Sequence, residues 1–188
     1  MKNEVLQAIA DRRSIRAYTE DQLTEEQLQA LLDAAVQSPS AVNRQPWHFS
    51  VVQDKALLDA FDAAMREELL KNAEGDARAR YESPSYSVFY HAPTAIFISL
   101  PDPMPSVFAP VDAGIAVENI ALAAQSLGLG SVILGMPRVV FESERSEEFR
   151  RAFRFPEGYA FSIAIAVGVP AGTKAAHEVL PDRIDIIR

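Results

Sequence analysis

The sequence predicts one domain of helices and strands, in which helices cover a central β-sheet. Short apolar runs of strand length alternate along the chain with longer segments whose apolar residues recur every three or four positions. The length of 188 residues suits a single domain over 1–188, and no repeat or linker divides it. Hydrophobic residues make up 48% of the chain, which is enough for a core and too much for extended disorder.

Capping signals and apolar periodicity place the elements in chain order. Asn3 can cap a first helix that ends near Arg13. Thr24–Gln27 forms a capping box before a second helix that ends at Ser38. The polar segment over 75–87 is expected to be irregular. The remaining patterns predict a strand over 47–52, a helix over 55–73, a strand over 94–100, a helix over 112–127, a strand over 131–135, a helix over 142–153 and a strand over 159–170.

Composition excludes several kinds of site. The chain has no cysteine, which excludes disulfides and thiolate chemistry. Its three histidines, His48, His91 and His177, are too widely spaced to favour a metal site. A net charge of −8 argues against a nucleic-acid partner, because phosphate backbones repel an acidic surface. Without a signal-peptide pattern or an apolar run of membrane length, the chain is expected to be cytoplasmic and to have no membrane partner.

The C-terminal residues 171–188 are expected to form an arm that packs on a partner subunit. The arm is apolar but has no obvious local partner; its large apolar residues are Val179, Leu180, Ile184, Ile186 and Ile187. The helix predicted over 112–127 is apolar nearly all round, so it too needs a second surface to cover it. Both features favour a homodimer.

A cationic cluster, RRSIRAY over 12–18, interrupts an otherwise acidic chain. Arg12, Arg13 and Arg16 surround Ser14 where the first helix is predicted to end. One interpretation is a solvated helix end, where arginines meet the negative pole of the helix dipole. The other is a site for a small phosphate, which guanidinium forks and a hydroxyl bind well. The residues alone leave both open.

Two further segments have an ordinary interpretation and a functional one. SPSAVNRQPW over 38–47 is either a plain loop or a rim of polar side chains, Ser40, Asn43 and Gln45, for a polar heterocycle. In GLGSVILGMP over 128–137, a glycine-capped helix leads into a strand, and Gly135 would let a flat ring approach the backbone. These glycines do not follow the dinucleotide-binding spacing, and no side chain stands out as a catalytic acid or base.

Taken in order, RRSIRAY, SPSAVNRQPWHF, LGLGSVILG and FPEGYAFSIAIAVGVP, followed by a lysine-bearing tail, resemble the nitroreductase family of FMN-dependent oxidoreductases. The resemblance covers nearly the whole chain. It implies an α+β fold with a central mixed β-sheet flanked by helices. It also implies a homodimer with exchanged terminal extensions and FMN bound at the subunit interface.

The resemblance also assigns cofactor-binding positions. A first group matches the residues that hold the phosphate and ribityl groups and approach the pyrimidine side of the flavin: Arg12, Arg13, Ser14 and Arg16. A second matches the loop that reaches the flavin from the other subunit: Pro39, Ser40, Asn43 and Gln45. Leu134 and Gly135 match the strand end against the ring, and Lys174 matches a tail residue that reaches the phosphate, with His177 or Arg183 as alternatives.

The implied activity is an NAD(P)H-dependent flavin oxidoreductase. Hydride would pass from NAD(P)H to flavin N5 and then, in a ping-pong mechanism, to a small electron-poor acceptor such as a nitroaromatic or quinone. Met104, Phe108 and Met136 are candidates for the acceptor pocket. Two alternatives remain open: other flavin chemistry (enone reduction, dehalogenation or flavin fragmentation) and an FMN-binding module without turnover.

Overall fold

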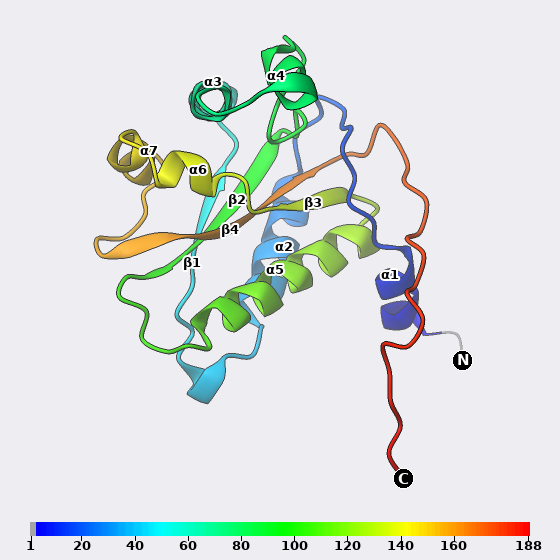
Figure 1. The fold of residues 1–188 in the computed structure, drawn as a ribbon. Helices are drawn as coiled ribbons and strands as arrows, with labels where there is room; N and C mark the ends of the chain where they lie inside the picture. Colours follow the sequence, from blue (N-terminus) through cyan, green and yellow to red (C-terminus); the bar gives the residue numbers. More distant parts are fainter. Residues whose placement is uncertain (1–2) are drawn as a thin grey trace.

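A computed structural model describes residues 3–188, with helices on both faces of a single four-stranded sheet (Figure 1). The strands are β1 (His48–Val52), β2 (Thr94–Pro101), β3 (Gly130–Leu134) and β4 (Tyr159–Gly168). The helices are α1 (Glu4–Asp11), α2 (Glu25–Val36), the 3-10 turn η1 (Ala41–Asn43), α3 (Lys55–Leu70), α4 (Gly75–Glu82), α5 (Ala109–Ser126), α6 (Arg138–Phe141) and α7 (Ser146–Ala152). The expected combination of a central sheet and covering helices is therefore confirmed.

The strand order is β1-β2-β4-β3, and each neighbouring pair is antiparallel. The expectation of a mixed sheet was wrong for these four strands. Alternating helices and strands do not set strand direction, because a helical connection is long enough to return the chain at either end of the sheet. A parallel pairing does occur outside the strands, as an isolated bridge between Ser14 and Ser131.

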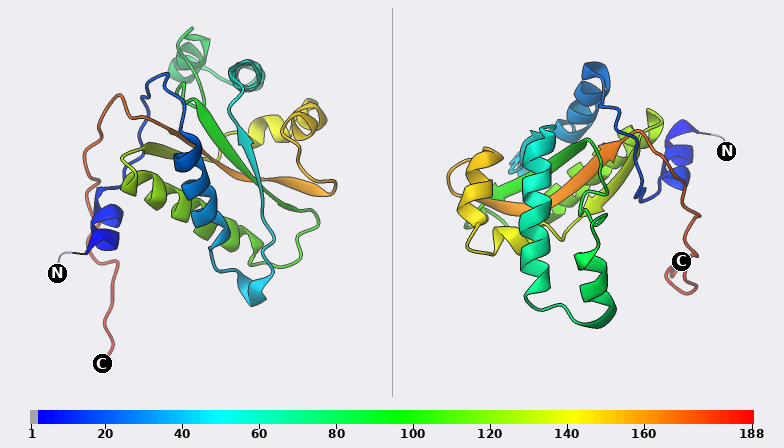
Figure 2. Two further views of the ribbon diagram at one scale, coloured as in Figure 1. Left: turned by 180° about the vertical axis from the view of Figure 1, so that it is seen from behind. Right: turned by 90° about the horizontal axis from the view of Figure 1, so that it is seen from above.

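Side chains alternate across the central strands, so the sheet separates two apolar layers. On β2, Ala95 and Phe97 face a layer that includes Phe61 of α3. Ile96 and Ile98 face the opposite layer, in which α2 and α5 pack. Figure 2 shows α2 and α5 on one face of the sheet and α3, α6 and α7 on the other. Because β2 is covered on both sides, its sequence is almost wholly apolar.

Two elements differ from the sequence expectation. The segment expected to be irregular contains α4, in which Arg78 and Glu82 form an i,i+4 ion pair at 2.8 Å. The helix expected over 142–153 is shorter, since only α7 (Ser146–Ala152) lies in that range, and a further short helix, α6 (Arg138–Phe141), precedes it. Between them the Ser143 hydroxyl donates to the Val140 carbonyl and accepts from the Arg145 N–H, which ends one helix before the next begins.

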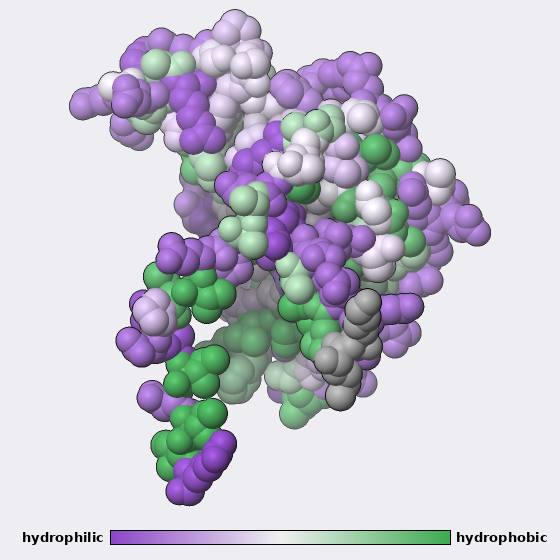
Figure 3. All heavy atoms as spheres, turned by 90° about the vertical axis from the view of Figure 1, so that its right-hand side faces the viewer, coloured by the Kyte–Doolittle hydropathy of each residue, from purple (hydrophilic) through white to green (hydrophobic). Residues whose placement is uncertain are grey.

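Residues 171–188 follow the last strand as an extended segment, whose packing on a partner subunit stays a prediction. No helix or strand occurs within them, and every residue is exposed. Figure 3 shows their apolar side chains extending away from the rest of the molecule. Ile187 is 96% exposed. The arm thus has no apolar partner within residues 3–188.

Candidate functional site

The structural base of the candidate site is the segment Ser14–Thr19, here called the crossing segment. Its backbone lies across the edge of the sheet between β3 and the chain that leaves β4. The Ile15 N–H donates to the Ser131 carbonyl at 2.9 Å, and the Thr19 N–H donates to the Val169 carbonyl at 2.9 Å. The Ala171 N–H donates in turn to the Ala17 carbonyl at 2.9 Å. These bonds bring the start of the arm against the cationic cluster.

Two glycines allow the crossing segment to approach the sheet. Gly130 and Gly168 are register partners on β3 and β4. A Cβ on Gly130 would lie 3.0 Å from Ile15 Cβ, and one on Gly168 would lie 2.7 Å from Pro93 Cδ and 3.0 Å from Tyr18 Cδ1. The 2.7 Å distance is shorter than real Cβ contacts, so position 168 requires a residue without a side chain, whereas a Cβ at position 130 would force Ile15 to move by a few tenths of an ångström.

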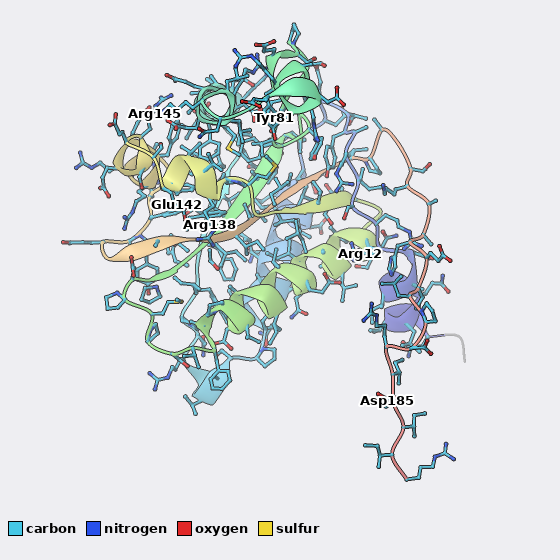
Figure 4. The ribbon with its side chains drawn as sticks, viewed as in Figure 1. Arg12, Tyr81, Arg138, Glu142, Arg145 and Asp185 are labelled. Atoms are coloured by element: carbon cyan, nitrogen blue, oxygen red, sulfur yellow. The ribbon has the colours of Figure 1, made fainter. Side chains whose placement is uncertain are left out.

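The three arginines of the cluster have different partners. The Arg12 Nε lies 3.3 Å from the Glu118 carboxylate, at the point where α1 meets α5 (Figure 4). Arg13 turns back on its own helix end and donates to the Ala10 and Arg12 carbonyls at 2.7 Å each. The helix-end interpretation thus describes the contacts of Arg13.

Arg16 points elsewhere. Its Nε donates to the Tyr90 hydroxyl at 3.3 Å, and its guanidinium carbon lies 5.6 Å from the centre of the Tyr90 ring. No ion pair joins Arg16 to a carboxylate in the part of the chain that the structure describes. Its charge therefore remains available to a bound anion.

Arg16 lines a hollow of about 260 Å³ between the crossing segment and the start of the arm, here called the arm recess. Its lining residues are Ser14, Ile15, Arg16, Ala17, Gly172, Thr173 and Lys174. The fold thus brings together Ser14, Arg16 and Lys174, three residues that the sequence singled out. The alternative tail cations His177 and Arg183 do not line it.

The other predicted end of the site, Leu134-Gly135, lies at the far end of β3. Ser131 bridges to Ser14 near the start of this strand. At about 3.3 Å per residue, β3 separates Ser131 from Gly135 by roughly 13 Å. Leu134 is buried in the layer on the α3 side, whereas a Cβ on Gly135 would meet no atom within 4 Å. Apart from its two sequence neighbours, no residue covers the place of a Cβ at Gly135, which leaves room for a flat group to approach the backbone.

The loop over 39–45 is a rigid turn away from the cationic cluster, at the end of the molecule where α5 begins (Figure 1). The Ser40 hydroxyl accepts the Gln45 N–H at 2.9 Å, and the Gln45 amide donates to the Asn43 side chain at 2.9 Å. Val42, Asn43 and Gln45 all have positive φ. Pro39, Ser40, Asn43 and Gln45 are thus not brought to Arg16 within one chain.

The candidate acceptor residues do not belong to the arm recess. Met104, Phe108 and Met136 are 55%, 57% and 39% exposed, and none of them lines the arm recess.

A second hollow, of about 550 Å³, adjoins the arm recess and is here called the tyrosine recess. Both share Arg16 and Ala17; its other lining residues are Tyr18, Arg80, Ser83, Ser85, Tyr86, Ser87, Tyr90 and His91. Burial raises the pKa of Tyr86 to about 12 and also raises the pKa of Tyr18. The Tyr18 hydroxyl already donates to the Ile15 carbonyl at 2.7 Å.

Sequence reasoning missed two kinds of residue. Tyr90 and Arg80 escaped notice because they lie in a polar stretch with no motif, and only the fold places them beside Arg16. Asp112 is buried in α5, where its carboxylate accepts the Ala41 N–H at 3.0 Å and fixes the loop over 39–45. A lone acid in an Ala-rich apolar helix was the available signal for Asp112.

Two further searches cover the described residues. Residues 3–188 contain no group of three or more His, Cys, Asp or Glu side chains placed to hold a metal ion. None of the helices in that range has both the length and the apolarity needed to cross a membrane.

Comparisons with known proteins point to one family. The sequence model of the nitroreductase family matches residues 9–169. A provisionally named NADH dehydrogenase/NAD(P)H nitroreductase of Methanothermobacter thermautotrophicus is 34% identical over 98% of this chain and 87% of its own length. The FMN reductase (NAD(P)H) of Bacillus subtilis is 30% identical over 95% of this chain and 71% of its own. The crystal structure of a nitroreductase with bound FMN from Desulfitobacterium hafniense has a TM-score of 0.92 and 36% identity, over 100% of both chains.

The packing of the crossing segment can be tested with two glycine variants. Gly168→Ala is expected to lower the free energy of unfolding by about 1–3 kcal/mol, because the new methyl group overlaps Pro93 and Tyr18. Gly172→Ala is the control, since its Cβ would lie 3.5 Å from Ala17 Cβ, an ordinary contact. Urea denaturation measures both. Equal stability of the two variants would contradict the close approach described here.

Proposed function

Because the chain belongs to the nitroreductase family, we propose that it binds FMN and acts as an NAD(P)H-dependent flavin oxidoreductase. The observation that carries this proposal is the arm recess, where two cationic side chains and a hydroxyl converge in an acidic protein. The compared proteins are named for NAD(P)H or for bound FMN, which supports the same activity for this chain.

The residues present fit the shape and charge of FMN. This cofactor is elongated, with a phosphate at one end and a flat ring system at the other. Lys174 and Arg16 supply the positive charge that the phosphate needs, and the Ser14 hydroxyl adds a donor. About 13 Å along β3, Gly135 leaves its backbone open to the ring. We propose that Arg12, Arg13 and Leu134 complete this set in the same subunit.

FMN would supply the redox chemistry, which is hydride acceptance from NAD(P)H and hydride donation to an electron-poor acceptor. The protein would position the cofactor and its substrates and would supply the charged groups around them. Arg16 and Lys174 would hold the phosphate, and the open backbone at Gly135 would admit reductant and acceptor in turn. When reductant and acceptor bind in turn at the same place, hydride transfer through FMN needs no side chain as a general base. For this reason we propose no catalytic side chain.

We propose a nitroaromatic or a quinone as the acceptor, because both accept hydride at a flat, electron-poor centre. Two alternative functions predict different kinetic results. Enone reduction, dehalogenation or flavin fragmentation on this fold requires turnover with the corresponding substrates. An FMN-binding module without turnover requires slow flavin reduction by both NADH and NADPH.

A homodimer is the second part of the proposal. Val5, Leu6 and Ile9 form an exposed apolar face on α1, and the arm exposes five more large apolar residues. A second copy of the chain would cover these surfaces and bring its loop over 39–45 to the flavin. We therefore propose that residues 171–188 pack on the partner subunit and that Pro39, Ser40, Asn43 and Gln45 complete the site across the interface.

An absorbance spectrum tests the proposed function directly. The purified protein is expected to be yellow, or to become so with FMN, and NADH or NADPH is expected to bleach it without oxygen. Addition of a nitroaromatic or quinone should then restore the oxidised spectrum. A protein that cannot be reconstituted with FMN would refute the proposal.

The phosphate end can be tested with two tail variants. Lys174→Gln is expected to weaken FMN binding about tenfold or more, because a hydrogen bond to a charged group contributes about 1.5–3 kcal/mol. Binding of riboflavin, which has no phosphate, should not change. Arg183→Gln is the control, since Arg183 lies on the same arm but outside the arm recess. Equal losses for FMN and riboflavin would remove Lys174 from the phosphate site.

The role of the arm can be tested by analytical ultracentrifugation. The double variant Ile184→Glu, Ile187→Glu is expected to dissociate the dimer, because it places two charges in the proposed apolar interface. Both side chains are exposed in the single chain, so its folding should not suffer. Asp185→Asn, between them, is the control and should remain dimeric. A monomeric wild-type protein, or a dimeric double variant, would contradict the proposal.

A further inference from the structure

The tyrosine recess has the charge and surface of an anion site, and Arg16 is the one residue of its lining that the cofactor proposal uses. Two guanidinium groups, those of Arg16 and Arg80, line it together with tyrosine and serine hydroxyls. None of its ten lining residues is an aspartate or glutamate, although the chain has 26 of them. The buried Asp62 carboxylate lies behind this lining, where it bonds to Ser87 and accepts the Val88 N–H at 2.8 Å. The charges of the lining itself are the two guanidinium groups.

The pairing of the α4 arginines indicates which one is available to a ligand. Arg78 is held by Glu82 at 2.8 Å. Arg80, two positions on, has no ion-pair partner among residues 3–188 and lies 6.0 Å from the centre of the Tyr86 ring. Figure 4 marks the place of this helix with Tyr81, the next residue. An unpaired guanidinium against an aromatic ring is well arranged to receive a phosphate.

The backbone that lines the recess is strained. Tyr90 and His91 have φ values of 55° and 60°, in the left-handed region that bulky residues seldom adopt. The buried Ser87 hydroxyl holds this turn by accepting the Phe89 N–H at 3.1 Å and the His91 N–H at 3.2 Å. Backbone strain of this kind is retained where surrounding bonds enforce it, and it clusters at binding sites. Here it directs the Tyr90 hydroxyl to Arg16.

We propose that the tyrosine recess binds the phosphate-bearing adenosine half of the reduced nicotinamide dinucleotide. This inference rests on the proposed function. Arg80 contacts the phosphates, while Arg16 stays with FMN, and the Tyr86 and Tyr90 rings supply apolar surface for the base. The volume of about 550 Å³ suits a ligand of this size. Because the recess shares Arg16 and Ala17 with the arm recess, the adenosine half bound there lies beside the phosphate end of FMN, and the nicotinamide half is free to extend toward the ring.

A binding experiment on the FMN-loaded protein tests the site without turnover. The probes are ADP-ribose and 2′-phospho-ADP-ribose, titrated calorimetrically. Arg80→Gln is expected to weaken the binding of the tighter probe about tenfold, which is the loss of one charge-assisted contact. Arg78→Gln removes the same charge from the same helix but spares the recess, so it should change binding less than about twofold. Tighter binding of the 2′-phosphate probe would indicate that the recess recognises NADPH. Equal binding of both probes would indicate that it recognises the diphosphate, which NADH and NADPH share.

A kinetic experiment separates this inference from the proposed function. Arg80→Gln should raise the KM for the preferred nicotinamide dinucleotide about tenfold and leave kcat unchanged. The KM for 1-benzyl-1,4-dihydronicotinamide, a hydride donor without phosphates, should stay the same in both variants.

Three results would overturn the inference while flavin reduction by NAD(P)H still supported the function. The first is that the wild-type protein binds neither probe. The second is that Arg78→Gln and Arg80→Gln weaken binding equally. The third is that Arg80→Gln raises only the KM of an anionic acceptor such as 4-nitrobenzoate. The last result would assign the recess to the acceptor. Failure of every dihydronicotinamide to reduce the flavin would instead refute the proposed function.

Discussion

The candidate site depends on main-chain hydrogen bonds that hold the crossing segment between β3 and the end of β4. Ile15 bonds to Ser131, Thr19 to Val169 and Ala171 to Ala17. Backbone bonds of this kind fix residue positions whatever the side chains are, provided that the chains can approach, and Gly130 and Gly168 make the approach possible. As a result, Lys174 at one end of the sequence lies with Ser14 and Arg16 near the other.

The arginines near the candidate site differ in how far partners within the chain already use their charge. Arg12 is paired with Glu118, and Arg13 with the carbonyls that end α1. Arg16 and Arg80 have aromatic neighbours and no carboxylate partner within residues 3–188. In a chain with a net charge of −8, guanidinium groups without a carboxylate partner produce a local positive potential that attracts a small anion. The proposed phosphate sites follow from this difference.

The sequence predicted those parts of the structure that local patterns determine. Apolar runs located the strands, capping signals located α1 and α2, and ordered motifs indicated the nitroreductase-like fold, which the TM-score of 0.92 confirms. Strand direction and the partners of individual arginines depend on contacts distant in sequence, so they could not be predicted. The same holds for the tyrosine recess. Arg80 and Tyr90 carry no motif, and their relation to Arg16 exists only in the folded chain.

The loop over 39–45 explains how a site divided between two subunits could be organised in advance. Three of its residues have left-handed backbones, which persist only where other bonds enforce them. Asp112 and Ser40 supply those bonds from within the same chain. A loop that is already rigid loses little conformational entropy when subunits associate, so more of the interface energy remains for binding. In the proposed dimer, the arm provides apolar area, while this loop contributes a preformed polar edge to the flavin site.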